Sequence, residues 1–133
     1  MRKLAIILAV AACLSGNAHA SVNANENQAQ PDIEIWLGEG VGRYGDREFT
    51  IRGGSTKYPT PTGAFTVEWK SRKWWSKQWD AAMPYAMFFH RGAAMHQGVL
   101  RGHSHGCVRL SEEDAKYLFK VTKEKQTRVF VYP

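Results

Sequence analysis

Cysteines and long apolar runs are both scarce in this chain. Its 133 residues include only two cysteines, Cys13 and Cys107, and no C-x2-C pair. Structural zinc sites usually show such paired spacings, so we expect no metal centre and no other cofactor. A metal-binding module remains an alternative because the potential zinc ligands are numerous: His90, His96, His103, His105 and Cys107. The one long apolar run, residues 4–14, covers 11 residues and is too short to cross a bilayer, so we expect no stable membrane span.

The first 20 residues have the three parts of a secretory signal peptide. A positively charged start precedes the apolar run, and Ala18-His19-Ala20 has the small-x-small form after which signal peptidase cuts. We therefore expect a signal peptide over 1–20 and an exported protein in the periplasm or cell envelope. Residues 10–13 also fit lipoprotein processing, which would leave a lipid anchor at Cys13. In either case Cys13 does not pair with Cys107, so one thiol stays unpaired in an oxidising compartment.

Neither sign of charge dominates. Without Arg2 and Lys3 the chain has 16 basic and 12 acidic residues, a net charge of +4. Four of the cations interleave with four tryptophans over residues 69–79: Lys70, Arg72, Lys73 and Lys77 with Trp69, Trp74, Trp75 and Trp79. An exported protein rarely meets nucleic acid, so we expect no nucleic-acid partner. The segment either binds an anionic envelope polymer or forms a solvated basic face over half-buried tryptophans.

The length allows one domain, and hydrophobic periodicity predicts that it is mainly β. Residues 21–31 are polar and predict a disordered tether before a domain over 32–133. Alternating or short apolar runs predict five strands, at 33–37, 46–52, 65–69, 86–89 and 127–132. Glycine-rich residues 38–45 indicate a break, and 69–79 has no clean period, which predicts a loop or short helix. One helix is expected after Ser111, where Asp114 three residues later resembles a capping box.

The segment Ser104-His105-Gly106-Cys107-Val108-Arg109-Leu110 is the candidate for chemistry. Cys107 is the only thiol outside the leader, Gly106 leaves room for a substrate, and imidazoles stand nearby. A reactive cysteine needs such exposure and such a proton-accepting neighbour, so we interpret Cys107 as a nucleophile. The alternative is a small buried hydrophobe, which is common for free cysteine. Backbone N–H groups over 105–107 could bind an oxyanion, and on a strand Arg109 would share a face with Cys107.

These residues resemble a known family. Residues 104–109, with Met95-His96 upstream and Pro59-Thr60-Pro61-Thr62-Gly63 further back, are similar to the motifs of the L,D-transpeptidase (YkuD-type) catalytic domain. The resemblance runs from about Ile33 to the C-terminus. It implies a β-sandwich of mixed sheets, with one helix after the Ser-His-Gly-Cys motif.

The resemblance also implies roles for particular residues. His96 would be the base, and His105 would shape the site, with a second-base role as the alternative. Ser104 would hydrogen-bond within the motif, and Tyr85, in the segment before His96, would join Ser104 and Arg109 in binding substrate. Arg109 would clamp a carboxylate of the substrate, or else form a surface salt bridge.

The implied activity is that of an exported cysteine L,D-transpeptidase acting on peptidoglycan stem peptides. Cys107 would attack the carbonyl between the third-position diamino acid and D-alanine, and an amine of a second stem would resolve the acyl-enzyme as a 3-3 cross-link. Resolution by water would make the chain an L,D-carboxypeptidase, and a non-catalytic peptidoglycan-binding domain is a further alternative. The seven residues from Gln97 to His103 form a shorter loop than most members have, so the identity of the acyl acceptor stays open. The oligomeric state is open as well.

Overall fold

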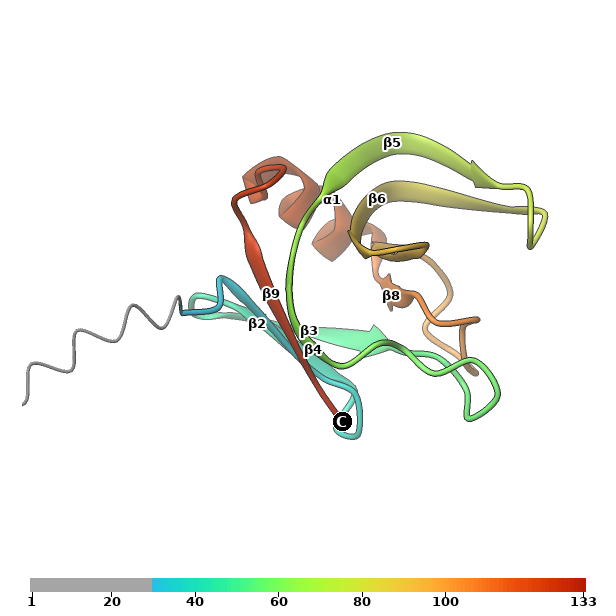
Figure 1. Ribbon diagram of the computed structural model, residues 1–133, viewed down its shortest axis with the longest axis horizontal. Coiled ribbons are helices and arrows are strands. Elements are labelled where there is room, and N and C mark those ends of the chain that lie inside the picture. Colours follow the sequence, from blue (N-terminus) through green and yellow to red (C-terminus); the bar gives the residue numbers. More distant parts are fainter. Residues whose placement is uncertain (1–29) are drawn as a thin grey trace, which may run out of the picture.

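The computed structural model describes residues 30–133, which form one curled β-sheet with a single helix (Figure 1). The signal peptide, the lipoprotein site at Cys13 and all but the last two residues of the expected tether lie outside the described residues. The mainly β prediction with one helix behind the motif is confirmed.

Nine strands make up the sheet, and their bounds are β1 (Ile33–Trp36), β2 (Val41–Tyr44), β3 (Arg47–Arg52), β4 (Gly63–Thr66), β5 (Trp69–Ser76), β6 (Ala81–His90), β7 (Ala93–Gln97), β8 (Val108–Leu110) and β9 (Arg128–Tyr132). The helix α1 spans Glu112–Val121. The strand order is β4-β9-β1-β2-β3-β8-β7-β6-β5. The β1–β9 and β7–β8 pairs are parallel and the remaining pairs antiparallel, so the sheet is mixed.

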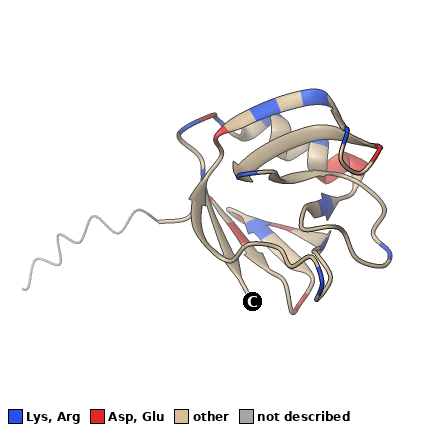
Figure 2. Cartoon of the chain, turned by 45° about the vertical axis from the view of Figure 1, so that its right-hand side comes forward, with Lys and Arg blue, Asp and Glu red and all other residues tan. Residues whose placement is uncertain are grey.

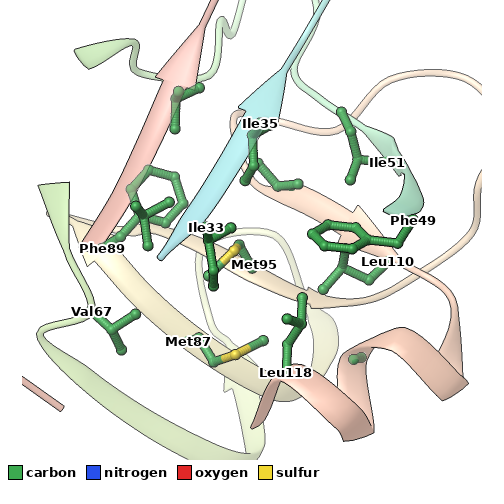
Figure 3. Packing of buried hydrophobic residues seen from close by; sticks show 14 residues of the cluster. Ile33, Ile35, Phe49, Ile51, Val67, Met87, Phe89, Met95, Leu110 and Leu118 are labelled. Atoms are coloured by element: carbon green, nitrogen blue, oxygen red, sulfur yellow. The ribbon is translucent and has the colours of Figure 1, made fainter. Parts of the chain in front are cut away.

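The core lies inside the curl, where side chains of β1, β3, β6, β7, β8, β9 and α1 pack together (Figure 3). Alternate residues of β1 and β3 point into it, as the period-two pattern predicted: Ile33, Ile35, Phe49 and Ile51 are all buried. They meet Met87 and Phe89 of β6, Met95 of β7, Leu110 of β8 and Leu118 of α1. Burial of this apolar set supplies the main driving force for closing the sheet.

The helix begins at the predicted residue. Ser111 is the N-cap, and its Oγ accepts a hydrogen bond from the Asp114 backbone N–H at 3.1 Å. At the other end the Lys70 ammonium of β5 donates to the carbonyls of Phe119 and Thr122, at 2.8 and 2.7 Å. Cations near a helix C-terminus satisfy its free carbonyls and complement its dipole. The cap and Lys70 therefore fix both ends of α1 against the sheet.

Three of the expected boundaries were wrong. The glycine-rich stretch 38–45 contains strand β2. Its Gly42 lies against the Phe49 ring, and a Cβ there would come within 2.2 Å of the ring, so this glycine allows close packing and does not mark a break. The single strand expected over 65–69 is divided between β4 and β5. Residues 69–79 are mostly strand β5 and neither a loop nor a helix. Most of β5 is exposed, so no buried stripe imposes a period on its sequence.

The basic and aromatic residues of β5 are divided between two surroundings. Figure 2 shows cations along β5 on the outer edge of the sheet. Lys70 is committed to the end of α1, and the Arg72 guanidinium lies 5.8 Å over the Tyr85 ring. Trp69, Trp74 and Trp79 instead line a groove on the other side of the sheet. The segment is thus not a uniform basic face over half-buried tryptophans.

Candidate active site

The parallel strands β7 and β8 bring the predicted catalytic residues together. Met95 pairs with Val108, and His96 with Arg109. Because side chains alternate along a strand, Met95, Val108 and Leu110 enter the core, while His96, Cys107 and Arg109 lie on the opposite face. That face borders a groove of about 870 Å³, which His105, Gly106 and Ser104 also line.

The Cys107 thiol is half-buried in this groove. Its Sγ lies 3.9 Å from the Gly92 carbonyl oxygen in the β6–β7 turn. Burial raises the pKa of the Cys107 thiol above its ordinary value, although a backbone hydrogen bond with Ala94 and the charge of Arg109 both act to lower it. The thiol therefore rests in its protonated form and needs a base before it can attack.

His96 has the surroundings of such a base. It is 7 % exposed, and its Nδ1 lies 2.7 Å from the Gln97 carbonyl oxygen. A carbonyl can only accept, so Nδ1 carries the proton and Nε2 is left to take one. Burial lowers the pKa of His96; the hydrogen bond to the Gln97 carbonyl opposes this, and the Arg109 charge adds to it. The imidazole is therefore neutral at pH 7, the form in which an imidazole can act as a general base.

Ser104 and Gly106 shape the turn that carries the nucleophile. The Ser104 hydroxyl donates to the Cys107 carbonyl and accepts from the Gly106 N–H at 3.1 Å. Gly106 has φ of 118°, a conformation that favours glycine. Ser104 thus hydrogen-bonds within the motif, as expected. The positive φ explains why position 106 is a glycine.

A neighbouring segment, residues 53–55, braces this turn and was missed from the sequence. The Ser104 N–H donates to the Gly53 carbonyl at 2.9 Å, and the Ser55 N–H donates to the Ser104 carbonyl at 3.3 Å. A Cβ at Gly54 would lie 1.9 Å from the Tyr58 carbonyl oxygen and 3.0 Å from the Gly106 Cα. No larger residue fits there without moving the backbone. The available signal in the sequence was the pair of adjacent glycines, Gly53 and Gly54.

His105 links the motif to the tip of the β5–β6 hairpin. Its ring stacks on Trp79 with centroids 3.8 Å apart and planes 3° apart, and it meets Tyr58 edge-on at 5.2 Å. This packing orients the His105 ring through two aromatic neighbours that sequence reasoning had not assigned to the site. His105 thus packs between the hairpin and the motif, and the shaping role expected for it stays a prediction.

Arg109 lines the groove but makes contacts that were not anticipated. Its Nη1 faces the Val99 and Arg101 carbonyl oxygens at 3.5 and 3.4 Å, and the aliphatic part of its side chain packs against Gly98. Among residues 30–133 no carboxylate lies within salt-bridge distance of Arg109. Arg109 therefore braces the short 97–103 loop, and its remaining N–H groups are the ones that could bind a substrate carboxylate.

Tyr85 is not brought to this site. It has φ of 56°, which for a bulky residue within a strand is unusual, and its ring packs edge-on to Phe119 of α1 at 5.7 Å. It borders a separate cavity of about 350 Å³ with Arg72 and Lys116. The expectation that Tyr85 binds substrate beside Ser104 and Arg109 is therefore wrong in its placement, because the left-handed backbone directs the ring to the helix side.

The other histidines are at the margin of the site or outside it. His90 packs on Phe65, with centroids 4.9 Å apart, and borders the groove, while His103 is exposed on the short loop. Within the described part of the chain, no three histidine, cysteine, aspartate or glutamate side chains come together as metal ligands would. Residues 30–133 also contain no helix that is long and apolar enough to cross a membrane.

Comparison with known proteins finds a matching family model and similar solved structures. The family model for the L,D-transpeptidase catalytic domain (YkuD) matches residues 30–131. An L,D-transpeptidase from Stackebrandtia nassauensis superposes with a TM-score of 0.71 at 22% identity, covering 84% of this chain and 62% of that one. One from Mycobacterium smegmatis gives 0.66 at 17% identity, covering 76% and 58%.

A third solved structure, L,D-transpeptidase 3 from Mycobacterium tuberculosis in complex with a faropenem-derived adduct, gives a TM-score of 0.65 at 21% identity and covers 77% of this chain and 61% of that one. The chain thus spans less than two thirds of each of these structures, and the likeness concerns the fold. A comparison with curated protein sequences finds no match.

Proposed function

Because the chain belongs to the L,D-transpeptidase catalytic domain family, we propose that it is a peptidoglycan L,D-transpeptidase with Cys107 as its nucleophile. The observation that carries the proposal is the register of β7 and β8, which sets a neutral, buried His96 and a protonated Cys107 on one groove face. A binding domain would need neither the thiol nor the base.

The first half-reaction follows from these protonation states. His96 takes the thiol proton, and the Cys107 sulfur attacks the carbonyl between the diamino acid and D-alanine of a tetrapeptide stem. Backbone N–H groups of the 105–107 turn hydrogen-bond to the oxyanion of the tetrahedral intermediate. As that intermediate collapses, the C–N bond breaks, the proton on His96 passes to the departing amine, and a thioester remains on Cys107.

The second half-reaction reverses the proton transfers. An amine of a second stem attacks the thioester, His96 accepts its proton, and the Cys107 thiolate leaves and regains a proton. The product is a 3-3 cross-link.

The experiment that tests the function is mass spectrometry of the purified protein with a tetrapeptide stem and, separately, with a carbapenem. We expect loss of D-alanine from the stem and a covalent adduct on Cys107 with each compound, and no adduct on Cys107→Ala. Product analysis with two stems then shows whether a cross-linked dimer or a tripeptide forms. A tripeptide alone would make the enzyme an L,D-carboxypeptidase. Absence of any adduct would leave a non-catalytic wall-binding domain.

Export is part of the proposal, since peptidoglycan lies outside the cytoplasm. It is supported by the charge, apolar run and Ala18-His19-Ala20 of residues 1–20. N-terminal sequencing of the processed protein should begin at Ser21. A blocked, lipid-modified Cys13 would instead identify a lipoprotein, and an unprocessed Met1 would contradict export.

A further inference from the structure

The groove extends beyond the reacting residues along an aromatic wall. Trp69 stacks on Phe88 with centroids 3.8 Å apart and planes 8° apart. Trp74 stands nearly perpendicular to both, at 5.2 Å and 78° from Trp69 and at 5.7 Å and 83° from Phe88. The three rings, which we call the aromatic corner, all line the same groove as Cys107.

Packing within the protein accounts for Phe88, which is 3 % exposed, but not for the two tryptophans of the aromatic corner. Trp69 is 36 % and Trp74 41 % exposed, so both leave a large apolar area in contact with water. Such area on a monomer usually marks a binding surface. Because the corner belongs to the groove that holds the nucleophile, its occupant is part of the substrate that reaches Cys107.

The peptide stem itself is a poor match for this wall. Its carboxylates are anionic, and the faces of aromatic rings are electron-rich and disfavour anions. Cations that suit carboxylates, Arg91 and Arg109, lie elsewhere along the groove. A pyranose ring matches the corner better, because its axial C–H groups present a flat, weakly positive face. Ser76, Lys77 and Gln78 also line the groove and offer hydrogen bonds to hydroxyl and acetamido groups.

We propose that Trp69 and Trp74 of the aromatic corner, supported from behind by the buried Phe88, bind a sugar ring of the glycan strand to which the donor stem is attached. The inference rests on the proposed function and deepens it: the donor recognised in the groove is the stem on its glycan, and the free peptide is a poorer substrate. Trp74 is the residue to test, since Trp69 is stacked on Phe88 and its removal would disturb the wall.

The test compares two donors, a disaccharide-tetrapeptide and the same tetrapeptide without sugars, by the ratio of their kcat/KM values for D-alanine release. Wild type should prefer the sugar-bearing donor, and Trp74→Ala should reduce this preference on the order of tenfold, with Trp74→Phe in between because it keeps an aromatic face. The control is Trp75→Ala, which removes the neighbouring tryptophan of β5. Trp75 is 53 % exposed and lies outside the groove, so its loss should leave the ratio unchanged.

A binding measurement separates the inference from the proposed function. Cys107→Ala protein is titrated with a β-1,4-linked N-acetylglucosamine tetrasaccharide that carries no peptide, and intrinsic tryptophan fluorescence is followed. We expect saturable binding that Trp74→Ala weakens and Trp75→Ala does not. Saturable binding without turnover of either donor would support the sugar site while contradicting the proposed enzyme.

Three results would overturn the inference. Equal turnover of the two donors by wild type would show an active enzyme that ignores the glycan. Equal effects of Trp74→Ala and Trp75→Ala on the ratio would show that the corner is not the sugar site. A wild-type dimer in analytical ultracentrifugation that Trp74→Ala dissociates would show that the corner is covered by a second copy of the chain.

Discussion

The two faces of the β7–β8 pair have different surroundings, the core on one side and the groove on the other. On one face Met95, Val108 and Leu110 are fully buried in the core. On the other, one residue along in each strand, His96, Cys107 and Arg109 border the groove. The backbone is shared, so the core holds the groove residues in position without contributing to their chemistry. Substitutions on the two faces should therefore separate stability from activity.

Cys107→Ala should cause the largest loss of turnover and should affect the groove face without affecting the core face. Without the sulfur no thioester can form, so turnover should fall to the limit of detection. The half-buried side chain leaves only a small space, so the urea unfolding midpoint should change little. Turnover and unfolding are measured on the same preparation. Equal loss of stability and activity would instead support a packing role for the thiol.

His96→Ala should lower kcat by roughly a hundredfold to ten-thousandfold, the range expected for loss of a general base. His90→Ala is the matched control because His90 borders the same groove but packs on Phe65. Its effect on kcat should be small. A larger effect of His90→Ala would show that the base has been assigned to the wrong strand.

Leu110→Ala should lower the stability of the fold without affecting the chemistry of the groove face. Leu110 is fully buried, and truncation of a buried leucine costs about 2–5 kcal/mol of the free energy of unfolding. Urea unfolding should show this loss, while carbapenem titration of Cys107 in the protein that stays folded should be close to wild type. Loss of titratable sites without loss of stability would mean that the two faces are coupled.

Arg109 variants should separate the effect of the Arg109 charge on the thiol from the effect of its planar geometry on substrate binding. Arg109→Lys keeps the charge but loses the planar fork, so kcat/KM for the stem should fall roughly tenfold to a hundredfold. Arg109→Gln also removes the charge that lowers the pKa of Cys107. The raised thiol pKa makes alkylation by iodoacetamide accelerate with rising pH, and Arg109→Gln should move that profile to higher pH. The Arg109→Lys profile should match wild type; a shift as large as that of Arg109→Gln would exclude the clamp.

Residues with local signals could be predicted from the sequence, and residues with distant partners could not. β1 and β3 alternate because only one of their faces is buried, and Ser111 with Asp114 marks the helix start within four residues. β5 shows no period because most of its residues are exposed. The division of Phe65–Trp69 between two strands depends on which neighbours each pairs with, β9 or β6, and no local pattern reports that.

The same distinction applies to the site. His96 and Cys107 belong to short motifs: His96 lies in β7, and Cys107 directly precedes β8, the strand that pairs with β7. The contacts of Ser104 with Gly53 and of His105 with Trp79 join segments far apart in the sequence. Tyr85 was misplaced because its left-handed φ cannot be inferred from the residue type. Pairing partners and unusual dihedrals are properties of the closed sheet.

The bridge between Gly54 and Ser104 also has a consequence for how the protein folds. Its two residues are about fifty positions apart, so the turn that carries Cys107 is completed only after the first half of the domain has met the second. Contacts between such distant segments form late, because the chain loses conformational entropy on closing the loop before the contacts contribute any stabilisation. A partly folded chain would then carry an ordinary thiol without its oriented turn, and reactivity would arise together with the finished fold.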